Sequence, residues 1–306
     1  MTSHPTNIAG LKSYLHDLFT IKDLGHAKYF LGLEIARSSS GTYIHQRKYI
    51  LDILKDVGLL DCKPTSTPFP RGFKVAGSGV PLREPDTYRR LIGRLMYLNM
   101  SRRDVTYCIQ QLSQFINNPY SSHWDAAIHV LRYLKGCPSK GLFYSAAESF
   151  KFEAFCDADW ATCLDTRKSL TGYCIFFGGS LVSWKTKKQL IVSKSSTNQA
   201  VHSCGRCCAQ VLWMRQQPRD YEIEEKEIPI MCDNTSAIAI TQNPVLHSRT
   251  KHIDVRYHFI RDHVEKKDIT LEYISTDKRL VDIFTKPLCE SRFEELKHEL
   301  GLIELS

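Results

Sequence analysis

Aspartates at the ends of apolar runs are the residues of this sequence best suited to do chemistry. Asp157 and Asp159 end a hydrophobic run that begins at Phe152, Asp233 ends another run, and Asp282 lies inside a third. A carboxylate beside a hydrophobic core costs free energy unless a cation, a hydrogen bond or water receives it. Acids from three distant segments predict one shared site, because two-metal phosphoryl transfer needs several carboxylates around cations about 3.5–4 Å apart. The alternative at each position is an ordinary strand end where aspartate forms a turn.

To bring these acids together, the chain must form a sheet whose strands end at one edge, with helices packed beside it. Apolar runs predict strands and 3.6-residue apolar periods predict helices. In the second half, the predicted strands start at Phe152 and cover 172–177, 180–185, 229–233 and 268–275, and the predicted helices cover 197–217, 234–242, 252–266 and 279–285. In the first half, we predict helices at 10–19, 48–57, 88–98, 104–116 and 123–134, a strand at 28–37 paired with 41–46, and a loop rich in Pro and Gly at 62–81.

The charge of the chain is unevenly distributed. Its 306 residues carry a net charge of +8, and 42% of them are hydrophobic, which is ordinary for a globular chain with room for two cores. Residues 1–147 hold 19 Lys and Arg against 10 Asp and Glu, whereas residues 148–306 hold 22 against 23. A basic part beside a near-neutral one predicts that one part holds a polyanion and the other processes it. A solvated basic surface without a partner is the alternative.

The sequence contains 11 cysteines, an odd number. It shows neither a secretory signal nor an apolar run of the roughly 20 residues that a membrane span needs, so we expect an intracellular setting, cytoplasmic or nuclear, with free thiols. Cys204, Cys207 and Cys208 lie close together and could suggest zinc. They fall on the apolar stripe of the predicted helix 197–217, and no second pair has zinc spacing, so we interpret them as packing residues.

A series of motifs in the second half resembles the ribonuclease H domain of copia-type retrotransposon Pol polyproteins. The resemblance extends from Asp157 to Leu288, and its motifs occur in the family's order. They are Cys156-Asp157-Ala158-Asp159-Trp160-Ala161, Arg167-Lys168-Ser169-Leu170-Thr171-Gly172-Tyr173, Val182-Ser183-Trp184, Lys187-Lys188-Gln189, Ser195-Ser196-Thr197, Cys232-Asp233-Asn234-Thr235-Ser236-Ala237-Ile238, Asn243-Pro244, Arg249-Thr250-Lys251-His252-Ile253-Asp254-Val255-Arg256-Tyr257-His258-Phe259-Ile260 and Val281-Asp282-Ile283-Phe284-Thr285-Lys286-Pro287-Leu288.

This resemblance implies an α/β fold: a ribonuclease H-like mixed sheet with flanking helices. It implies an RNA–DNA hybrid as substrate and Mg²⁺ as cofactor in a two-metal site. The family's acids map onto Asp157, Asp233 and Asp282 as catalytic and metal-binding residues. Lys251, just before the predicted helix 252–266, or Arg256 within it could contact phosphate, with helix packing and capping as the main role of this segment.

One expected acid is missing. The family has a glutamate on the long helix, in a pattern like Ser-Ser-Thr-Glu-Ala-Glu-Tyr, whereas this chain reads Ser195-Ser196-Thr197-Asn198-Gln199-Ala200-Val201. We align the catalytic glutamate with Ala200, which faces inward on the apolar stripe. Losing a ligand weakens metal affinity and misplaces the attacking water, and a displacement of about 1 Å alone can cost about 100-fold in rate. We expect Asp159 not to compensate, because we place its side chain on the other face of the sheet.

The first half resembles another part of the same polyproteins. Lys22-Asp23-Leu24-Gly25, Tyr29-Phe30-Leu31-Gly32-Leu33-Glu34 and Gln46-Arg47-Lys48-Tyr49 are similar to the stretch after the polymerase centre of the reverse transcriptase. The resemblance implies that Phe30, Leu31 and Gly32 lie against a primer strand, with a plain structural hairpin as the alternative. The polymerase also needs a Tyr-x-Asp-Asp turn, which in the family precedes this stretch. The sequence contains no Asp-Asp pair, so we expect no nucleotide polymerisation from this chain alone.

Residues 88–145 are expected to be helical and are similar to the thumb and connection of the polyprotein. The motifs there are Ser101-Arg102-Arg103-Asp104, Ser113-Gln114-Phe115, His123 and Leu131-Arg132-Tyr133-Leu134-Lys135-Gly136. Arg89, Arg90 and Arg94 form a basic helix face that could follow a duplex through its phosphates. We therefore predict three parts. Residues 1–80 are the end of a polymerase palm and have an α+β arrangement. Residues 81–147 are a helical thumb or connection-like region, and residues 148–306 are a ribonuclease H-like domain.

The sequence thus predicts a C-terminal fragment of a copia-type polyprotein with a degenerate nuclease site. The expected partners are RNA–DNA hybrid or duplex nucleic acid and the upstream polymerase part, with no membrane. Two other interpretations stay open: a nucleic-acid-binding module that does not cut, and a translated relic without a role. Hybrid binding without turnover would favour the module, and aggregation without binding would favour the relic.

Overall fold

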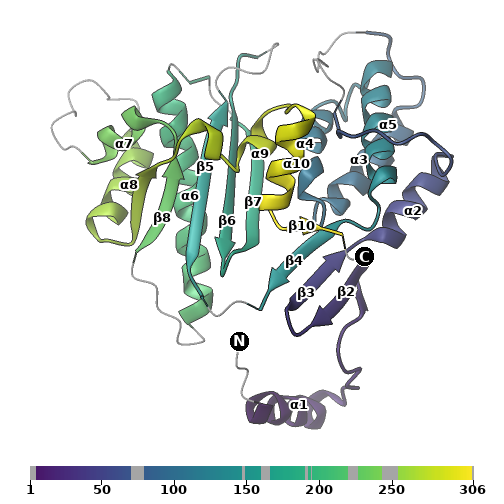
Figure 1. Cartoon of the computed structure of the whole chain (residues 1–306), viewed down its shortest axis with the longest axis horizontal. Coiled ribbons are helices and arrows are strands. Elements are labelled where there is room, and N and C mark those ends of the chain that lie inside the picture. The colour runs from purple at the N-terminus through teal and green to yellow at the C-terminus, as the bar shows by residue number, and fades with distance from the viewer. Residues whose placement is uncertain are drawn as a thin grey trace.

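The structure is a computed structural model of the chain. It describes residues 5–69, 79–146, 149–159, 166–189, 192–193, 195–219, 227–242 and 254–304. Two sheets lie side by side, and helix α1 (Pro5–Phe19) stands apart from both (Figure 1). None of the described helices combines the length and the apolar composition that a membrane-spanning segment needs.

The first sheet is antiparallel and combines the two ends of the chain. Its strands are β1 (Tyr29–Phe30), β2 (Leu33–Ser38), β3 (Gly41–His45), β4 (Gly141–Ser145) and β10 (Leu302–Ile303), in the order β1-β2-β3-β4-β10. Next to it pack α2 (Arg47–Asp56), α3 (Pro85–Leu98), the 3-10 turn η1 (Arg103–Val105), α4 (Thr106–Ser113) and α5 (Ser121–Gly136). Helix α2 forms because Ile50, Ile53 and Leu54 repeat at helical spacing, and all three are fully buried.

The second sheet is mixed. Its strands are β5 (Phe152–Asp159), β6 (Leu170–Phe177), β7 (Ser180–Lys188), β8 (Ile228–Cys232) and β9 (Ile269–Tyr273), in the order β7-β6-β5-β8-β9. Strands β5, β6 and β7 are antiparallel neighbours, whereas β5, β8 and β9 run parallel. The mixed sheet with flanking helices confirms the fold class predicted from the sequence.

Each face of the second sheet has its own helices. On one face lie α6 (Ser196–Arg219), α7 (Thr235–Gln242) and α8 (Asp254–Glu265), which share a core with Tyr173 and Ile175. On the other face lie α9 (Asp282–Thr285) and α10 (Glu290–Glu299), which share a core with Cys174 and Phe176 (Figure 1). Neighbouring residues of a strand point to opposite faces, so β6 contributes side chains to both cores.

The structure corrects several details of the predicted elements, and one of them is the helical region predicted at 88–145, which ends in strand β4. The predicted strand 28–37 is two short strands, because Leu31 and Gly32 both have positive φ, 49° and 74°, and make a turn between β1 and β2. Helix α10 and strand β10 were not predicted. They return to the first sheet, where Leu302 pairs with Leu142.

The predicted division of the chain at 1–80, 81–147 and 148–306 stays a prediction. The packing crosses its second boundary, since Phe284, Phe293 and Leu296 share one core with Ile50 and Leu95. The two halves are therefore joined by a continuous apolar core.

Candidate functional site

Three of the predicted acids meet at one edge of the second sheet. Strands β5 and β8 are parallel neighbours, so Asp157 near the end of β5 and Asp233 just after β8 arrive at the same edge. Asp282 is the first residue of α9, which packs on β6 beside β5. Gly172, the β6 partner of Asp157, makes this approach possible: a Cβ there would lie 2.7 Å from Thr285 Cγ2.

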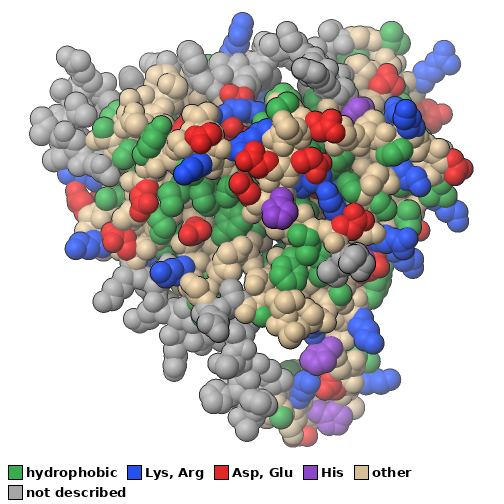
Figure 2. All heavy atoms as spheres, viewed as in Figure 1, with side chains coloured by type: hydrophobic (Ala, Val, Ile, Leu, Met, Phe, Trp, Pro, Cys, Tyr) green, Lys and Arg blue, Asp and Glu red, His purple; other side chains and the backbone are tan. Residues whose placement is uncertain are grey.

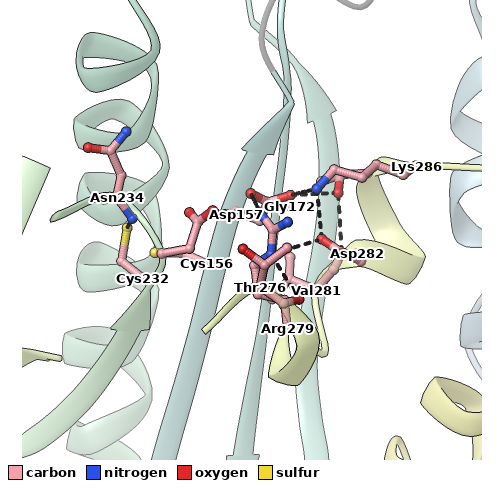
Figure 3. A network of polar contacts seen from close by, with 12 residues as sticks. Cys156, Asp157, Gly172, Cys232, Asn234, Thr276, Arg279, Val281, Asp282 and Lys286 are labelled. Atoms are coloured by element: carbon pink, nitrogen blue, oxygen red, sulfur yellow. Dashed lines mark hydrogen bonds and ion pairs between the residues drawn. The ribbon is translucent and has the colours of Figure 1, made fainter. Parts of the chain in front are cut away.

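Two basic side chains lie among the carboxylates and bind them directly. Arg279 Nη1 is 2.6 Å from Asp233 Oδ2 and 3.4 Å from Asp157 Oδ1, and its Nε is 3.6 Å from Asp282 Oδ1. Lys286 Nζ is 2.9 Å from Asp282 Oδ1 and 3.4 Å from Asp157 Oδ2. Figure 3 shows Asp157, Arg279, Asp282 and Lys286 pointing toward one another. We call Asp157, Asp233, Asp282, Arg279 and Lys286 together the carboxylate cluster.

Hydrogen bonding and burial fix the cluster further. Thr285 Oγ1 donates to Asp157 Oδ2 at 2.8 Å, and the Asp157 side chain is only 3% exposed. Burial raises the pKa of Asp233, although Arg279 acts to lower it. Burial alone would lower the pKa of Lys286, but the charges of Asp157 and Asp282 raise it above its usual value, so the ammonium stays protonated.

Asp159 belongs to this neighbourhood, contrary to our expectation. Residues two apart on a strand face the same way, so Asp159 shares the sheet face of Asp157. Burial raises its pKa to about 6, with further increases from Asp157 and Asp282 and opposing effects from Lys286 and Arg279. The sequence argument placed this side chain on the wrong face, and a fourth carboxylate therefore lies at the cluster.

A pocket of about 160 Å³ opens beside the cluster and is closed on one side by α6. Ala200 forms part of that wall and is buried, with the inward orientation that the sequence predicted. The neighbouring Gln199 also lines the pocket. Its side chain is buried, and neither amide atom has a hydrogen-bond partner among the described residues.

The described residues do not fit a complete two-cation centre. Carboxylate oxygens are the ligands that Mg²⁺ prefers. Here the oxygens of Asp157, Asp233 and Asp282 already bind a guanidinium and an ammonium, and the predicted glutamate position is an alanine. A divalent ion entering between Asp157 and Asp233 would have to displace Arg279.

The predicted primer-contacting residues lie at the turn between β1 and β2. Phe30 and Leu31 are exposed, and the Tyr97 hydroxyl of α3 donates to the Leu31 carbonyl, which ties the turn to that helix. The guanidinium of Arg94 lies over the ring of Tyr49, which packs edge-on against Tyr97. The turn and one of the predicted basic residues therefore form one connected surface.

The predicted phosphate-binding arginines of α3 differ in whether their charge is already paired with an acid. Arg94 pairs with Asp56 at 2.6 Å and Arg89 with Asp86 at 2.7 Å, so both charges are partly neutralised. Arg90 is exposed and donates to the Thr87 hydroxyl at 3.2 Å. Figure 2 shows basic and acidic side chains interspersed on the face in view rather than a single basic stripe.

Two further residues were expected to bind nucleic acid near α8. Arg256 is exposed on this helix and contacts the ring of His202 on α6. Lys251 lies outside the described residues.

Sequence reasoning missed three groups of the site. Arg279 and Lys286 stand three residues before and four residues after Asp282, a helical spacing that could have revealed them. The third group is a set of cysteines: Cys156, Cys204 and Cys232 are buried, and their sulfur atoms all lie within 4.8 Å of one another. Two of these cysteines directly precede the aspartates of the cluster.

Comparison with known proteins identifies the family. Residues 1–71 match the family model described as reverse transcriptase (RNA-dependent DNA polymerase). The chain is 36% identical to a retrovirus-related Pol polyprotein from transposon RE2 of Arabidopsis thaliana, over 95% of this chain and 20% of the relative. It is 33% identical to the corresponding polyprotein from transposon TNT 1-94 of Nicotiana tabacum, over 96% of this chain and 23% of the relative. An uncharacterized mitochondrial protein of Arabidopsis thaliana is 38% identical, over 65% of this chain and 83% of that protein.

These matches define the class of protein as the Pol polyproteins of retroelements. Within this class, the chain belongs to the retrovirus-related Pol polyproteins of copia-type transposons, as its motifs predicted. It spans about a fifth of the length of the transposon polyproteins that it matches.

Two solved structures show a more distant likeness. A foamy viral protease-reverse transcriptase in complex with dsDNA has a TM-score of 0.43 at 10% identity, over 90% of this chain and 52% of that one. LC11-RNase H1 in complex with an RNA/DNA hybrid has a TM-score of 0.35 at 12% identity, over 44% of this chain and 94% of that one. Because both TM-scores lie below 0.5, the ribonuclease H-like arrangement is taken from the chain's own strand order and directions.

Proposed function

We propose that the second sheet and its helices form a ribonuclease H-type module that engages RNA–DNA hybrid but cleaves it poorly. The observation that carries this proposal is the position of Arg279, whose guanidinium bridges Asp157 and Asp233 beside the alanine that replaces the expected acid. The class of reaction would be divalent-metal-dependent, endonucleolytic hydrolysis of RNA, with Asp157, Asp233 and Asp282 as the catalytic and metal-binding acids. The same three acids now hold two side-chain cations.

The electrostatics of the cluster support an impaired nuclease. A bound Mg²⁺ would supply positive charge to the phosphate under attack and to the attacking water. The three aspartates carry about three negative charges, and Arg279 and Lys286 offset two of them. The attraction that remains for a divalent ion is therefore smaller than for unpaired carboxylates. Asp159, whose pKa is raised to about 6, is mostly ionised at pH 7 and adds most of one further negative charge.

The first sheet and its helices support a holding role for the basic half. Phe30, Leu31 and Gly32 present an exposed turn, and the exposed Arg90 offers a charge to a phosphate. Such contacts would bind hybrid or duplex without reading its sequence. Nucleotide addition would come from a polymerase part elsewhere in such a polyprotein. A non-cutting nucleic-acid-binding module is the second candidate function, and the pairing of Arg279 with two of the catalytic acids favours it.

The nuclease assay compares four proteins on an RNA–DNA hybrid in Mg²⁺: the natural chain, Ala200→Glu, Ala200→Glu with Arg279→Gln, and the double variant with Asp157→Asn added. We expect little cleavage by the natural chain and at least a 100-fold gain in the double variant, because both the missing ligand and the displaced site are then restored. Asp157→Asn should abolish that gain. Cleavage by the natural chain at the rate of the double variant would contradict the proposal.

A binding assay distinguishes a protein that binds nucleic acid from a translated relic without a role. Hybrid binding by the natural chain should weaken as salt rises, because phosphate contacts release counterions. Folded protein that shows no hybrid affinity at low salt would exclude both nucleic-acid functions.

A further inference from the structure

A cluster of three thiols lies behind the carboxylate cluster, on the opposite face of the second sheet. Cys156 comes from β5, Cys232 from β8 and Cys204 from α6, so the three sulfur atoms belong to three separate elements. Cys156 precedes Asp157 and Cys232 precedes Asp233, and neighbouring strand residues point to opposite faces. The thiols therefore face α6 while the carboxylate of Asp157 faces α9.

The strand register explains why the thiols meet. In the parallel pair β5 and β8, Ala154 lies opposite Ile230 and Phe155 opposite Met231. One more step along both strands brings Cys156 beside Cys232. Helix α6 crosses this face, and Cys204 Sγ lies 3.3 Å from Cys156 Sγ. This convergence requires the folded sheet and cannot be seen as a motif in the sequence.

The geometry of the three sulfurs suits a metal ion. A zinc–sulfur bond is about 2.3 Å, so three thiolates around one ion place their sulfurs about 4 Å apart. The three sulfurs lie within 4.8 Å of one another, and each cysteine is at most 3% exposed. Small sulfur movements of a few tenths of an ångström would complete a trigonal set.

We propose that Cys156, Cys204 and Cys232 form a binding site for a thiophilic d10 cation, Zn²⁺ or Cu⁺. Thiolates select these soft ions over the hard, oxygen-preferring Mg²⁺. This site is distinct from the carboxylate cluster in ligand type and in sheet face, and it goes beyond the proposed nuclease function.

Two further observations support a ligand here. Cys156 and Cys232 line the 160 Å³ pocket, which gives an ion a path to the otherwise buried thiols. Gln199 lines the same pocket, and its side-chain oxygen and nitrogen have no hydrogen-bond partner among the described residues. A buried amide without partners costs free energy, so the polar wall of this pocket is better satisfied with an ion or its bound water inside.

The surroundings already orient two of the sulfurs. The Asn234 backbone N–H donates to Cys232 Sγ at 3.5 Å, and the Cys156 thiol donates to the Met231 carbonyl at 3.6 Å. Backbone N–H groups that donate to a metal-bound sulfur stabilise its thiolate form and fix its direction. A bound ion would join α6 to β5 and β8 directly behind the strand ends that carry Asp157 and Asp233.

The test uses the full chain, purified under reducing conditions and stripped of metal with a chelator. It is titrated with Co²⁺ as the optical probe of a Zn²⁺ site and, separately, with Cu⁺ buffered by glutathione. We expect one ion per chain with a thiolate-to-metal charge-transfer band, and a rise in melting temperature of roughly 5 °C at a hundredfold excess over Kd. Zn²⁺ is then added to displace Co²⁺, and of Zn²⁺ and Cu⁺ the ion that binds at the lower free concentration is the preferred one.

The matched variants are Cys204→Ala and Cys208→Ala. Both residues are buried on α6, but only Cys204 belongs to the three-thiol cluster. Cys204→Ala should weaken binding at least tenfold and lose the band, whereas Cys208→Ala should keep both. If Cys204→Ala does not fold, Cys204→Ser serves in its place. Asp157→Asn should leave the band unchanged, which separates this site from the nuclease site.

Three outcomes would overturn the proposal. The first is the absence of a charge-transfer band in the reduced natural chain while its circular dichroism shows the folded state. The second is equal loss of binding in the Cys204 and Cys208 variants. The third is a Cys156–Cys204 disulfide in the protein as isolated, combined with no ion uptake after reduction.

Discussion

The guanidinium of Arg279 lies 2.6 Å from the carboxylate of Asp233, within the group of acids that we propose as metal ligands. Arg279 comes from the segment just before α9, and Asp233 from the end of β8. Their contact joins two segments 46 residues apart. A side-chain cation thus lies where the proposed site would hold a divalent ion.

Replacing Arg279 with glutamine should destabilise the chain in the absence of divalent ions. The variant leaves Asp157 and Asp282 in contact with Lys286, whereas Asp233 keeps no ion-pair partner among the described residues. Removing one partner of a buried ion pair typically costs 3–5 kcal/mol, and we expect roughly 3 kcal/mol here, measured by urea unfolding. Added Mg²⁺ should restore part of this loss in the variant and leave the natural chain unchanged. Equal responses to Mg²⁺ would contradict the account.

A methyl group at Gly172 should push α9 off the sheet. Its Cβ would lie 2.7 Å from Thr285 Cγ2 and 2.9 Å from Val281 Cγ1, closer than such atoms can approach. We expect Gly172→Ala to lower the free energy of unfolding by about 1–3 kcal/mol. The matched control is Gly93→Ala on α3, where no atom of the described residues outside the local helix backbone lies within 4 Å of the new Cβ. That change should be neutral or stabilising by up to about 1 kcal/mol, because alanine favours the helix.

Asp159 should make the stability of the chain depend on pH near 6. Burial raises its pKa from 3.8 to about 6, so the folded state binds this proton more tightly than the unfolded state. The stability from this group is therefore fully present below about pH 3.8 and is lost as pH rises through 6. Asp159→Asn removes the effect, so the variant's melting temperature relative to the natural chain should increase between pH 5 and pH 7.5. A constant difference over this range would show that the carboxyl pKa is not raised.

Hybrid binding should depend on how the turn between β1 and β2 is held. Tyr97→Phe removes the hydroxyl that donates to the Leu31 carbonyl and keeps the ring that packs against Tyr49. We expect about fivefold weaker hybrid binding, corresponding to about 1 kcal/mol for a hydrogen bond. Melting temperature should change little, since Leu31 is exposed. Unchanged affinity would remove the turn from the nucleic-acid surface.

The sequence was sufficient to predict most of the second sheet and the meeting of its acids. The strand ends at Asp157 and Asp233 can be recognised from the local sequence, and parallel neighbouring strands bring such ends to one edge of the sheet. Asp159 was misplaced because the two-residue period of a strand was misapplied. The thiol cluster could not be predicted because the approach of Cys204 to Cys156 depends on how α6 crosses the sheet.

Other parts of the fold depended on long-range packing. Leu302 and Ile303 are too short a strand to recognise, and they form one only because β4 offers an edge. The break after Phe30 depends on the positive φ of Leu31, which a leucine adopts only when its surroundings enforce it. Arg279 stands three residues before Asp282, a helical spacing that predicts their contact, but nothing in the sequence shows that Asp157 and Asp233 approach the same guanidinium.

The most direct test of the central claim is the number of divalent ions that the carboxylate cluster binds. Mn²⁺ binding, measured by electron paramagnetic resonance on the natural chain and on Ala200→Glu combined with Arg279→Gln, reports this number. We expect no tight Mn²⁺ site in the natural chain and tight binding in the double variant, lost again when Asp157→Asn is added. Two tightly bound Mn²⁺ ions in the natural chain would show that Arg279 does not block the site and would contradict the account.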